Sequence, residues 1–338
     1  MASSSLGVGP TSSSSRLSFF FFDCDGWTPI GSPIDVGARI NEISLSADGL
    51  TATVQFGSGR LSVYRLVNDA AWVPIGDVFS GAGSGSLSDD GSVLSVGFPG
   101  SQPESGRVVV YDIVDGSLVQ RGGDIVGDDL WYGFGSKVVL SASGDTLVVG
   151  APDAPVFFPS FPPPFPANPD KTGLIQAYKW DGSVWVKSGE ALDPPSNFLL
   201  DFGRDFDLSA DASRMVVGTN FLFNIVSDYK LQVFDRIGDN WTQVGQEFGS
   251  GSTVTAPVSI TDDGSTITFT NSFVTDIGGG TVPPPVGYTM QLVDGEWTQV
   301  CATYTASPVV ISGDGSTVAL MTDFTGTRGA VQVYSTPR

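Results

Sequence analysis

One five-residue phrase recurs along the chain and limits what it can fold into more than any other feature. The phrase is an apolar residue, Ser or Thr, any residue, Asp and Gly, repeated at intervals of 42 to 68 residues. Ser and Asp side chains bond nearby backbone groups and Gly takes positive φ, so each copy predicts a tight turn between two strands. Its intact copies are Leu45–Gly49, Leu87–Gly91, Ile260–Gly264 and Ile311–Gly315, and its worn copies are Leu140–Gly144 and Leu208–Ala212.

Three further apolar segments follow most copies of the phrase, which makes the repeating unit four strands long. The fourth segment begins at Trp and ends four residues later at Gly, as in Trp72–Gly76, although Leu118–Gly122 lacks the Trp and Trp297–Cys301 lacks the Gly. A sheet this narrow is unstable alone, but sheets stacked around an axis bury both faces. Repeats of this length are typical of propellers. The sequence therefore predicts an all-β fold, a single β-propeller of four-stranded blades, with each Trp packed between neighbouring blades.

The two ends of the chain indicate how the ring closes. The last unit, 309–334, has three strands, and the first Trp strand, Trp27–Gly31, has no unit before it. We therefore expect the N-terminal strand to complete the last of six blades, although a spare strand at Leu17–Phe22 leaves seven blades as the alternative. The expected organisation is a disordered Ser-rich tail over 1–16 and a propeller over 17–338 with a Pro- and Phe-rich insertion at 153–172.

The charge of the chain excludes several classes of partner. The net charge is −20 and the 16 Lys and Arg residues form no cluster, which argues against nucleic acids and anionic lipid surfaces. No segment has the roughly 20 apolar residues of a membrane helix, and no secretory signal is evident, so the compartment stays open. Two cysteines, Cys24 and Cys301, are too few for a disulfide framework. We expect a monomer.

The chain contains no histidine, and this removes most of the familiar catalytic sites. Ser-His-Asp and Cys-His catalysis both need the imidazole, and two cysteines cannot build a structural zinc site. Paired carboxylates could still serve a glycosidase or lyase, but nothing in the sequence marks two of them as a pair. We therefore predict no enzyme activity, no catalytic residue and no metal site.

The third unit carries a further motif, Phe134-Gly135 followed by Gly150-Ala151-Pro152. It resembles the FG-GAP repeat of integrin α-chain N-terminal propellers, with partial matches at Phe202-Gly203 and Gly97-Phe98-Pro99. The resemblance implies a propeller, and such repeats often hold calcium through Asp residues at alternate positions. The hairpins here offer one Asp or two adjacent ones, with Asp23 and Asp25 the nearest match, so we assign no cofactor and keep calcium as the alternative.

Long insertions in three consecutive units point to a binding face. They span 153–172, 220–228 and 271–286, each between a second and a third strand, and so lie on one face of a propeller. Loops on a rigid scaffold are where binding usually occurs. The predicted function is a non-catalytic binding or scaffold propeller that engages a protein or glycan partner through this face of blades three to five; a propeller glycosidase or lyase and a purely structural repeat protein are the alternatives. The candidate binding residues are Trp131, Tyr132, Phe157, Phe158, Phe161, Phe165, Phe221 and Phe223.

Overall fold

The structure is a computed structural model, and every regular element that it describes is a β-strand. No helix long and apolar enough to cross a bilayer occurs in the described part of the chain. The described residues are 16–23, 26–38, 40–100, 105–128, 133–152, 173–194, 199–223, 226–250, 258–271, 286–300, 304–305, 309–321 and 331–335.

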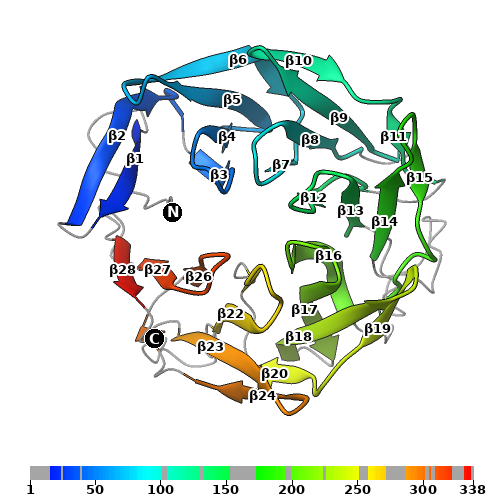
Figure 1. The fold of residues 1–338 in the computed structure, drawn as a ribbon. Coiled ribbons are helices and arrows are strands. Elements are labelled where there is room, and N and C mark those ends of the chain that lie inside the picture. Colours follow the sequence, from blue (N-terminus) through cyan, green and yellow to red (C-terminus); the bar gives the residue numbers. More distant parts are fainter. Residues whose placement is uncertain are drawn as a thin grey trace.

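The strands form a series of antiparallel sheets around a central opening (Figure 1). Six of them follow the repeat and are called sheets I to VI here, preceded by an N-terminal hairpin of β1 (Arg16–Asp23) and β2 (Gly26–Asp35). Sheet I holds β3 (Ile40–Leu45), β4 (Thr51–Phe56), β5 (Arg60–Val67) and β6 (Ala71–Ser80). Sheet II holds β7 (Ser84–Leu87), β8 (Val93–Phe98), β9 (Arg107–Val114), β10 (Ser117–Gln120) and the short β11 (Ile125–Val126).

The remaining sheets repeat the same order of strands. Sheet III holds β12 (Lys137–Leu140), β13 (Thr146–Ala151), β14 (Leu174–Trp180) and β15 (Trp185–Lys187). Sheet IV holds β16 (Leu199–Leu208), β17 (Arg214–Phe223), β18 (Val226–Ile237), β19 (Asn240–Gln243) and β20 (Phe248–Ser250). Sheet V holds β21 (Ser259–Ile260), β22 (Thr266–Asn271), β23 (Val286–Val293), β24 (Glu296–Gln299) and β25 (Tyr304–Thr305), and sheet VI holds β26 (Val309–Ile311), β27 (Thr317–Met321) and β28 (Val331–Ser335).

The strands of each unit run in order from the centre of the ring to its rim (Figure 1), and burial follows that order among the described residues. All six residues of β13, a second strand, are buried, whereas β10, a fourth strand, is mostly exposed. An inner strand is covered on both faces by the neighbouring sheets, so its sequence is continuously apolar instead of alternating. An outer strand meets solvent, and this explains why the repeat is most regular in its first two strands.

The apolar core is divided into clusters, each lying between two consecutive sheets. Val93 and Val110 of sheet II pack with Leu140 and Leu147 of sheet III, and Val148 of sheet III packs with Phe206 of sheet IV. Three more clusters of the described residues join the N-terminal hairpin to sheet I, sheet I to sheet II, and sheet IV to sheet V. Each sheet is therefore stabilised by its neighbours, as the narrow repeat requires.

The Trp that begins each fourth strand packs between neighbouring sheets, as predicted. Trp72 and Trp297 lie against the Gly that ends the fourth strand of the preceding unit: a Cβ at Gly31 would lie 2.8 Å from Cδ1 of Trp72, and one at Gly245 would lie 3.0 Å from Cδ1 of Trp297. At Gly189, the Gly before Trp241, the nearest atoms belong to Asp239 and Asn240 instead. Where the Trp is lost, Leu118 takes its place against Gly76. The Trp and Gly of the repeat therefore form a contact across the sheet boundary.

The Phe-Gly and Gly-Ala-Pro parts of the resemblance meet in the same way, and more closely. A Cβ at Gly150 of sheet III would lie 1.9 Å from the carbonyl oxygen of Gly203 in sheet IV, and one at Gly97 would lie 2.0 Å from that of Gly135. The Phe residues of the two pairs, Phe134 and Phe202, are fully buried. Glycine is required here because the backbones of consecutive sheets touch.

The ends of the chain differ in part from the expectation. Among the described strand pairs, β2 pairs with β1 and β28 pairs with β27, and no pairing joins β2 to β28. The spare strand of the sequence thus has a partner in β2, and the hairpin lies between β28 and sheet I (Figure 1). Gly31 of β2 contacts Trp72 of sheet I, as the fourth strand of a preceding unit would. The number of blades and the pairing that closes the ring stay predictions, and tail residues 1–15 lie outside the described residues.

The second insertion is not a loop but an extension of sheet IV. β17 and β18 stay paired through Asn220↔Tyr229 and on to Phe223↔Val226, so 220–228 is the end of a long hairpin. β16 also follows it, with Leu199 paired to Phe221. The insertion predicted at this position is thus a longer hairpin, because the strand pairing continues past the point where the other units end. Insertion residues 153–172 and 272–285 lie outside the described residues.

Replacing Gly150 with Ala tests the backbone contact between sheets III and IV. The added methyl group would overlap the Gly203 carbonyl, and we expect a loss of stability at or above the about 1–3 kcal/mol of ordinary overpacking. The control is Gly123→Ala, since a Cβ there meets nothing within 4 Å, and it should stay within about 0.5 kcal/mol of the parent. Urea unfolding gives both values; equal effects would refute the contact.

A second pair of glycines tests whether β2 packs on sheet I. Gly31 and Gly37 have φ of +70° and +63°, so alanine brings a similar backbone strain of about 1–2 kcal/mol at each. Only at Gly31 does the methyl group also meet Trp72. Gly31→Ala should therefore lower the melting temperature more than Gly37→Ala, as measured by calorimetry. If the two variants melt together, β2 does not occupy the outer-strand position.

Candidate functional site

The recurrent turns lie side by side around the central opening and are joined by backbone hydrogen bonds. The Asp48 amide donates to the Asp89 carbonyl at 3.3 Å, and the Asp89 amide donates to the Ala142 carbonyl at 3.0 Å. Ala142, Ala210 and Asp262 continue the series, each donating to the next turn over 2.8 to 2.9 Å, and it ends at the carbonyl of Gly313. We call this series the turn belt. In five of the six turns the residue that takes part in the belt is the third, variable residue of the phrase. The belt therefore uses a position that the turn itself leaves free to vary.

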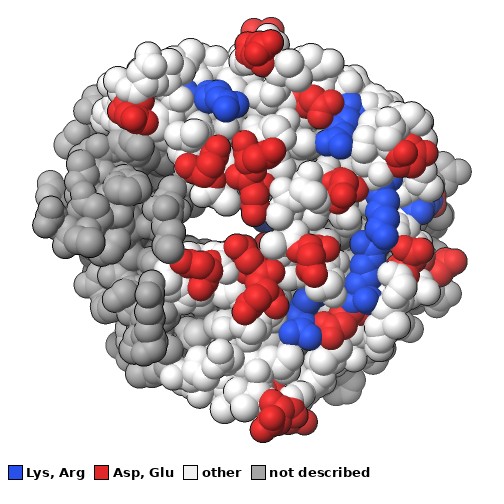
Figure 2. Space-filling model, viewed as in Figure 1, with Lys and Arg blue, Asp and Glu red and all other residues white. Residues whose placement is uncertain are grey.

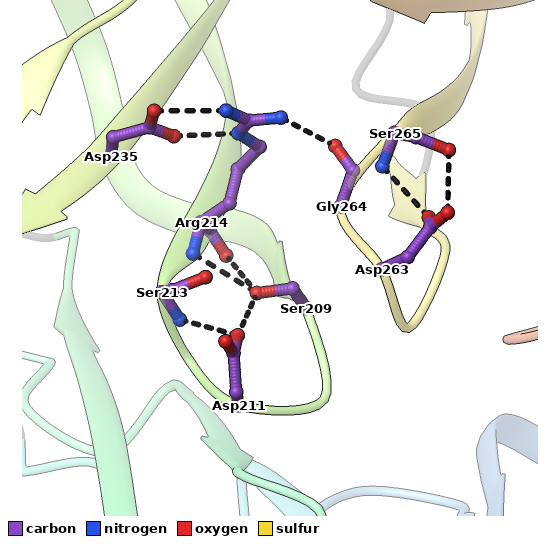
Figure 3. A network of polar contacts seen from close by, with 8 residues as sticks. All are labelled: Ser209, Asp211, Ser213, Arg214, Asp235, Asp263, Gly264 and Ser265. Carbon is purple, nitrogen blue, oxygen red and sulfur yellow. Dashed lines mark hydrogen bonds and ion pairs between the residues drawn. The ribbon is translucent and has the colours of Figure 1, made fainter.

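Within a turn, the Ser and Asp of the phrase bond each other and the backbone. In sheet IV, Ser209 Oγ donates to Asp211 Oδ1 at 2.9 Å, and the Arg214 amide donates to Ser209 Oγ at 3.0 Å (Figure 3). The last residue of the phrase in this sheet is Ala212, which has φ of +52°, where the other copies have Gly. In sheet III the phrase has Ser143 in place of Asp. There the acceptor is the carboxylate of Asp145, whose Oδ1 accepts a hydrogen bond from Ser143 Oγ at 2.6 Å.

Arg214 ties the turn of sheet IV to that of sheet V. Its guanidinium binds both carboxylate oxygens of Asp235, at 2.5 and 2.8 Å, and its Nη1 donates to the Gly264 carbonyl at 2.9 Å (Figure 3). The hydrogen bonds that Arg214 donates to Asp235 raise the pKa of Arg214. This planar fork fixes both partners at once, which a lysine could not do.

Acidic side chains gather around the opening on the face that carries these turns (Figure 2). Most are the turn Asp residues, whose oxygens are occupied by their own turns. The carboxylates of Asp89 and Asp262, by contrast, make no hydrogen bond or ion pair among the described contacts, although the backbones of both residues belong to the turn belt. Burial and the charges of Asp262 and Asp90 raise the pKa of Asp89. Burial and the charges of Asp314 and Asp263 raise that of Asp262. The mouth of the opening therefore concentrates uncompensated negative charge.

Deeper in the opening, charged side chains of the innermost strands meet. Lys137 Nζ of sheet III lies 2.7 Å from Glu42 Oε1 of sheet I, although sheet II intervenes, so the pair spans the centre of the ring. Asp205 and Asp207 of β16 accept hydrogen bonds from the amides of Val258 and Ile260 in sheet V, at 3.1 and 3.0 Å. Three carboxyl groups thus face one ammonium group, and we call Glu42, Lys137, Asp205 and Asp207 the channel cluster.

The pKa values of Asp205, Asp207 and Lys137 are displaced by partial burial and by the charges around them, although 23% of the Lys137 side chain stays exposed. Burial raises the pKa of Asp205 to about 7, against the Lys137 charge and the Val258 amide. Burial likewise raises the pKa of Asp207 to about 6, against the Ile260 amide and Lys137. Burial alone would lower the pKa of Lys137, but the charges of Glu42, Asp205 and Asp207 outweigh it and the pKa lies above the usual range.

The channel cluster was missed from the sequence, although a signal for it exists. Glu42, Lys137 and Asp205 each stand three residues before the apolar residue that opens the phrase, and Asp207 stands one before it. Side chains at these two positions share a face of the innermost strand because strand residues alternate. Aligning the units on the phrase and looking for charge at the two positions would have found the cluster.

Six of the eight predicted binding residues lie outside the residues that the structure describes. Trp131, Tyr132, Phe157, Phe158, Phe161 and Phe165 lie outside the described residues, as do Cys24, Cys301 and Asp25. Phe221 and Phe223 belong to the long hairpin of sheet IV. No group of three or more metal-ligating side chains occurs within the described ranges, and calcium binding is left untested.

Comparison with known proteins identifies the class of fold. No family model and no curated protein matches the chain. Among solved structures it is similar to the Cps50 (Swd1) β-propeller domain of Myceliophteria thermophila, with 11% identity over 100% of this chain and 99% of that one and a TM-score of 0.57. It is also similar to a chain of the mitotic checkpoint complex, with 12% identity over 98% and 91% and a TM-score of 0.58.

A third similar structure is Kuenenia stuttgartiensis hydrazine synthase, with 16% identity over 82% of this chain and 72% of that one and a TM-score of 0.52. Identities this low establish the fold alone. The chain is a β-propeller, and its function must be argued from its own residues.

Replacing Ala142 with Pro tests the turn belt. Ala142 is the second residue of a turn closed by the Gly144 amide on the Ser141 carbonyl, a position that accepts Pro, so the substitution removes the belt donor alone. We expect a loss of about 1 kcal/mol. The control is Ala47→Pro, at the same turn position in sheet I, where the belt donor is the amide of Asp48. Chemical denaturation should separate the two; equal stabilities would remove the belt's energetic role.

Proposed function

We propose that the protein is a non-catalytic propeller that binds a protein partner through the face opposite the turn belt. The observation that carries this is the uneven length of the connections between second and third strands. In sheet I, β4 and β5 are separated by residues 57–59 only. In sheets III and V the corresponding gaps run from Ala151 to Leu174 and from Asn271 to Val286, and sheet IV extends its hairpin to Phe223. Three consecutive sheets thus project extra chain from one face.

The composition of these segments supports a protein partner. Phe157, Phe158, Phe161 and Phe165 stand among prolines in the first of them, and large aromatic side chains are enriched where protein interfaces gain most of their binding energy. The two solved structures most alike in coverage include a chain from an assembly, the mitotic checkpoint complex. Membership of that assembly is a property of the other protein, and it supports the proposal of a binding role for this fold.

The channel cluster favours a second candidate, an acidic glycosidase or lyase. Asp205 and Asp207 are two residues apart on one strand, about 7 Å along it, and both have raised pKa values as a general acid needs. Both, however, already accept hydrogen bonds from backbone amides of sheet V. We therefore propose a structural role for them. Turnover of a glycoside panel that is lost in Asp205→Asn would reverse this assignment.

We also propose that the N-terminal strands close the ring and that the chain is allied to FG-GAP propellers. Contact between Gly31 and Trp72 supports the first, with β2 in the place of an outer strand. The relation to FG-GAP propellers is supported by two contacts: Gly203 packs on Gly150, and Gly135 packs on Gly97. In both, the Phe-Gly part of one unit meets the Gly-x-Pro part of the unit before it.

Deleting 156–167 tests the binding face. The full chain is used as bait, and the deletion should abolish capture of a partner that the parent retains, while the melting temperature changes little because the segment lies between two strands that pair without it. A variant with Phe157, Phe158, Phe161 and Phe165 replaced by Ser should show the same loss. Quantitative mass spectrometry of the captured proteins is the measurement.

The matched control is Val184→Ser, which removes an exposed apolar side chain from the opposite face of the same sheet. Its capture should equal that of the parent. Capture unaffected by the deletion would reject the face, and binding to a glycan array that disappears with the deletion would assign the face to a glycan instead.

A further inference from the structure

Equivalent positions of three units bring charged side chains to the same part of the central opening. Glu42, Lys137 and Asp205 each belong to the first strand of their sheet, at the position three residues before the phrase, in sheets I, III and IV. The corresponding residue of sheet II is Ser84, which is small, uncharged and buried. Because the first strands surround the opening in the same order of strands (Figure 1), charges far apart in the chain can meet there.

Lys137 connects two sheets that are not neighbours in the ring. Its Nζ donates to Glu42 Oε1 at 2.7 Å, although the two residues are 95 positions apart and sheet II stands between their sheets. The apolar clusters of the described residues, by contrast, each join neighbouring sheets. The ion pair is therefore a connection across the ring, whereas the apolar contacts run around it.

The same ammonium group also faces the carboxylates of sheet IV. The charges of Asp205 and Asp207 act on Lys137 together with that of Glu42. Asp205 is attracted to Lys137 and repelled by Glu42 and Asp207. Lys137 thus supplies the one positive charge that three carboxyl groups share. Solvent weakens each interaction in part, since 23% of the Lys137 side chain and 32% of the Glu42 side chain are exposed.

We propose that Lys137 is a cross-channel strap, whose ammonium group holds the carboxylates of Glu42 and Asp205 toward the axis and so couples sheet I to sheet IV. Without this group the two carboxylates repel each other across the opening. The strap makes the stability of one side of the ring depend on sheets on the other side. It needs no ligand, because the chain itself carries the cation.

Double-mutant cycles at pH 8 test the strap, because the carboxyl groups are largely ionised there. The pKa values of Asp205 and Asp207 are about 7 and about 6, and that of Lys137 lies above the usual range. Lys137→Met keeps the aliphatic part of the side chain and should raise the unfolding constant about tenfold, between the effects of breaking exposed and buried ion pairs. Urea unfolding of the full chain gives the constants.

The couplings distinguish a strap from a single ion pair. Lys137→Met combined with Glu42→Gln, and separately with Asp205→Asn, should each be more stable than the two single effects predict, by about twofold or more in the unfolding constant. Glu42→Gln combined with Asp205→Asn should deviate in the opposite direction, because those two carboxylates repel each other. A single ion pair would couple Lys137 to Glu42 alone.

The matched control is Lys187→Met, which removes the same charged group from an ion pair at the outer surface. Lys187 Nζ lies 2.5 Å from Asp128 Oδ2, and the two side chains are 43% and 54% exposed. This variant should change the unfolding constant by less than about fivefold. Sodium chloride at 1 M should stabilise Lys137→Met relative to the parent, because it screens the repulsion left in the channel, and should not do so for Lys187→Met.

A triple variant keeps the proposal testable if Lys137→Met does not fold. Lys137→Met with Glu42→Gln and Asp205→Asn removes the repulsion together with the cation, and it should be more stable than Lys137→Met alone. A triple variant that is no more stable would overturn the strap, because the loss would then come from the packing of the lysine side chain. Coupling of Lys137 to Glu42 without coupling to Asp205 would overturn it as well.

Discussion

The close approach of consecutive sheets is the constraint on which the rest of this structure depends. A four-stranded sheet cannot bury both of its faces by itself, so each unit is stable only against its neighbours. At the inner end of the boundary between sheets III and IV the backbones touch at Gly150 and Gly203, and at the outer end of other boundaries a Trp lies on a Gly, as Trp297 does on Gly245. These contacts set the spacing, and the apolar clusters fill what lies between.

Stacking around an axis has a consequence at the centre that the outer contacts do not have. Every unit contributes its first strand and first turn to the same small space, so polar groups that are spread through the chain become neighbours. The turn belt exploits this by joining a backbone amide of each turn to a backbone carbonyl of the next turn, from sheet I to sheet VI. The same geometry produces the channel cluster, which gathers three carboxyl groups around a single lysine and so brings like charges close together.

The two faces of the ring are therefore suited to different tasks. The face of short turns carries the belt and the acidic mouth (Figure 2), and its side chains are largely committed to one another. The opposite face carries the long connections of sheets III to V, which the framework of strands does not need. A scaffold that keeps one face rigid and varies the other is a common way for propellers and barrels to acquire partners.

Local patterns explain which predictions succeeded. The turn predicted at Leu45–Gly49 joins β3 to β4, because the polar residues and glycine of the phrase are a local signal. The expected pairing of Trp27–Gly31 with the C-terminal strand stays a prediction, whereas the pairing that the structure describes joins β2 to the adjacent β1. Residues joined by a short turn close a much smaller loop than residues at opposite ends of the chain.

By itself the sequence determined the all-β class, the repeating unit, its turns and the Trp and Gly of its outer strand, because each depends on residues a few positions apart. Only the tertiary structure decided that Glu42, Lys137 and Asp205 meet, that Gly150 must have no side chain, and that 220–228 continues a hairpin. Those outcomes depend on which sheets become neighbours around the axis. Composition and the spacing of motifs do not tell how far apart two units lie in space. The effect of one charge on another depends on that distance and on how far the surrounding protein excludes water.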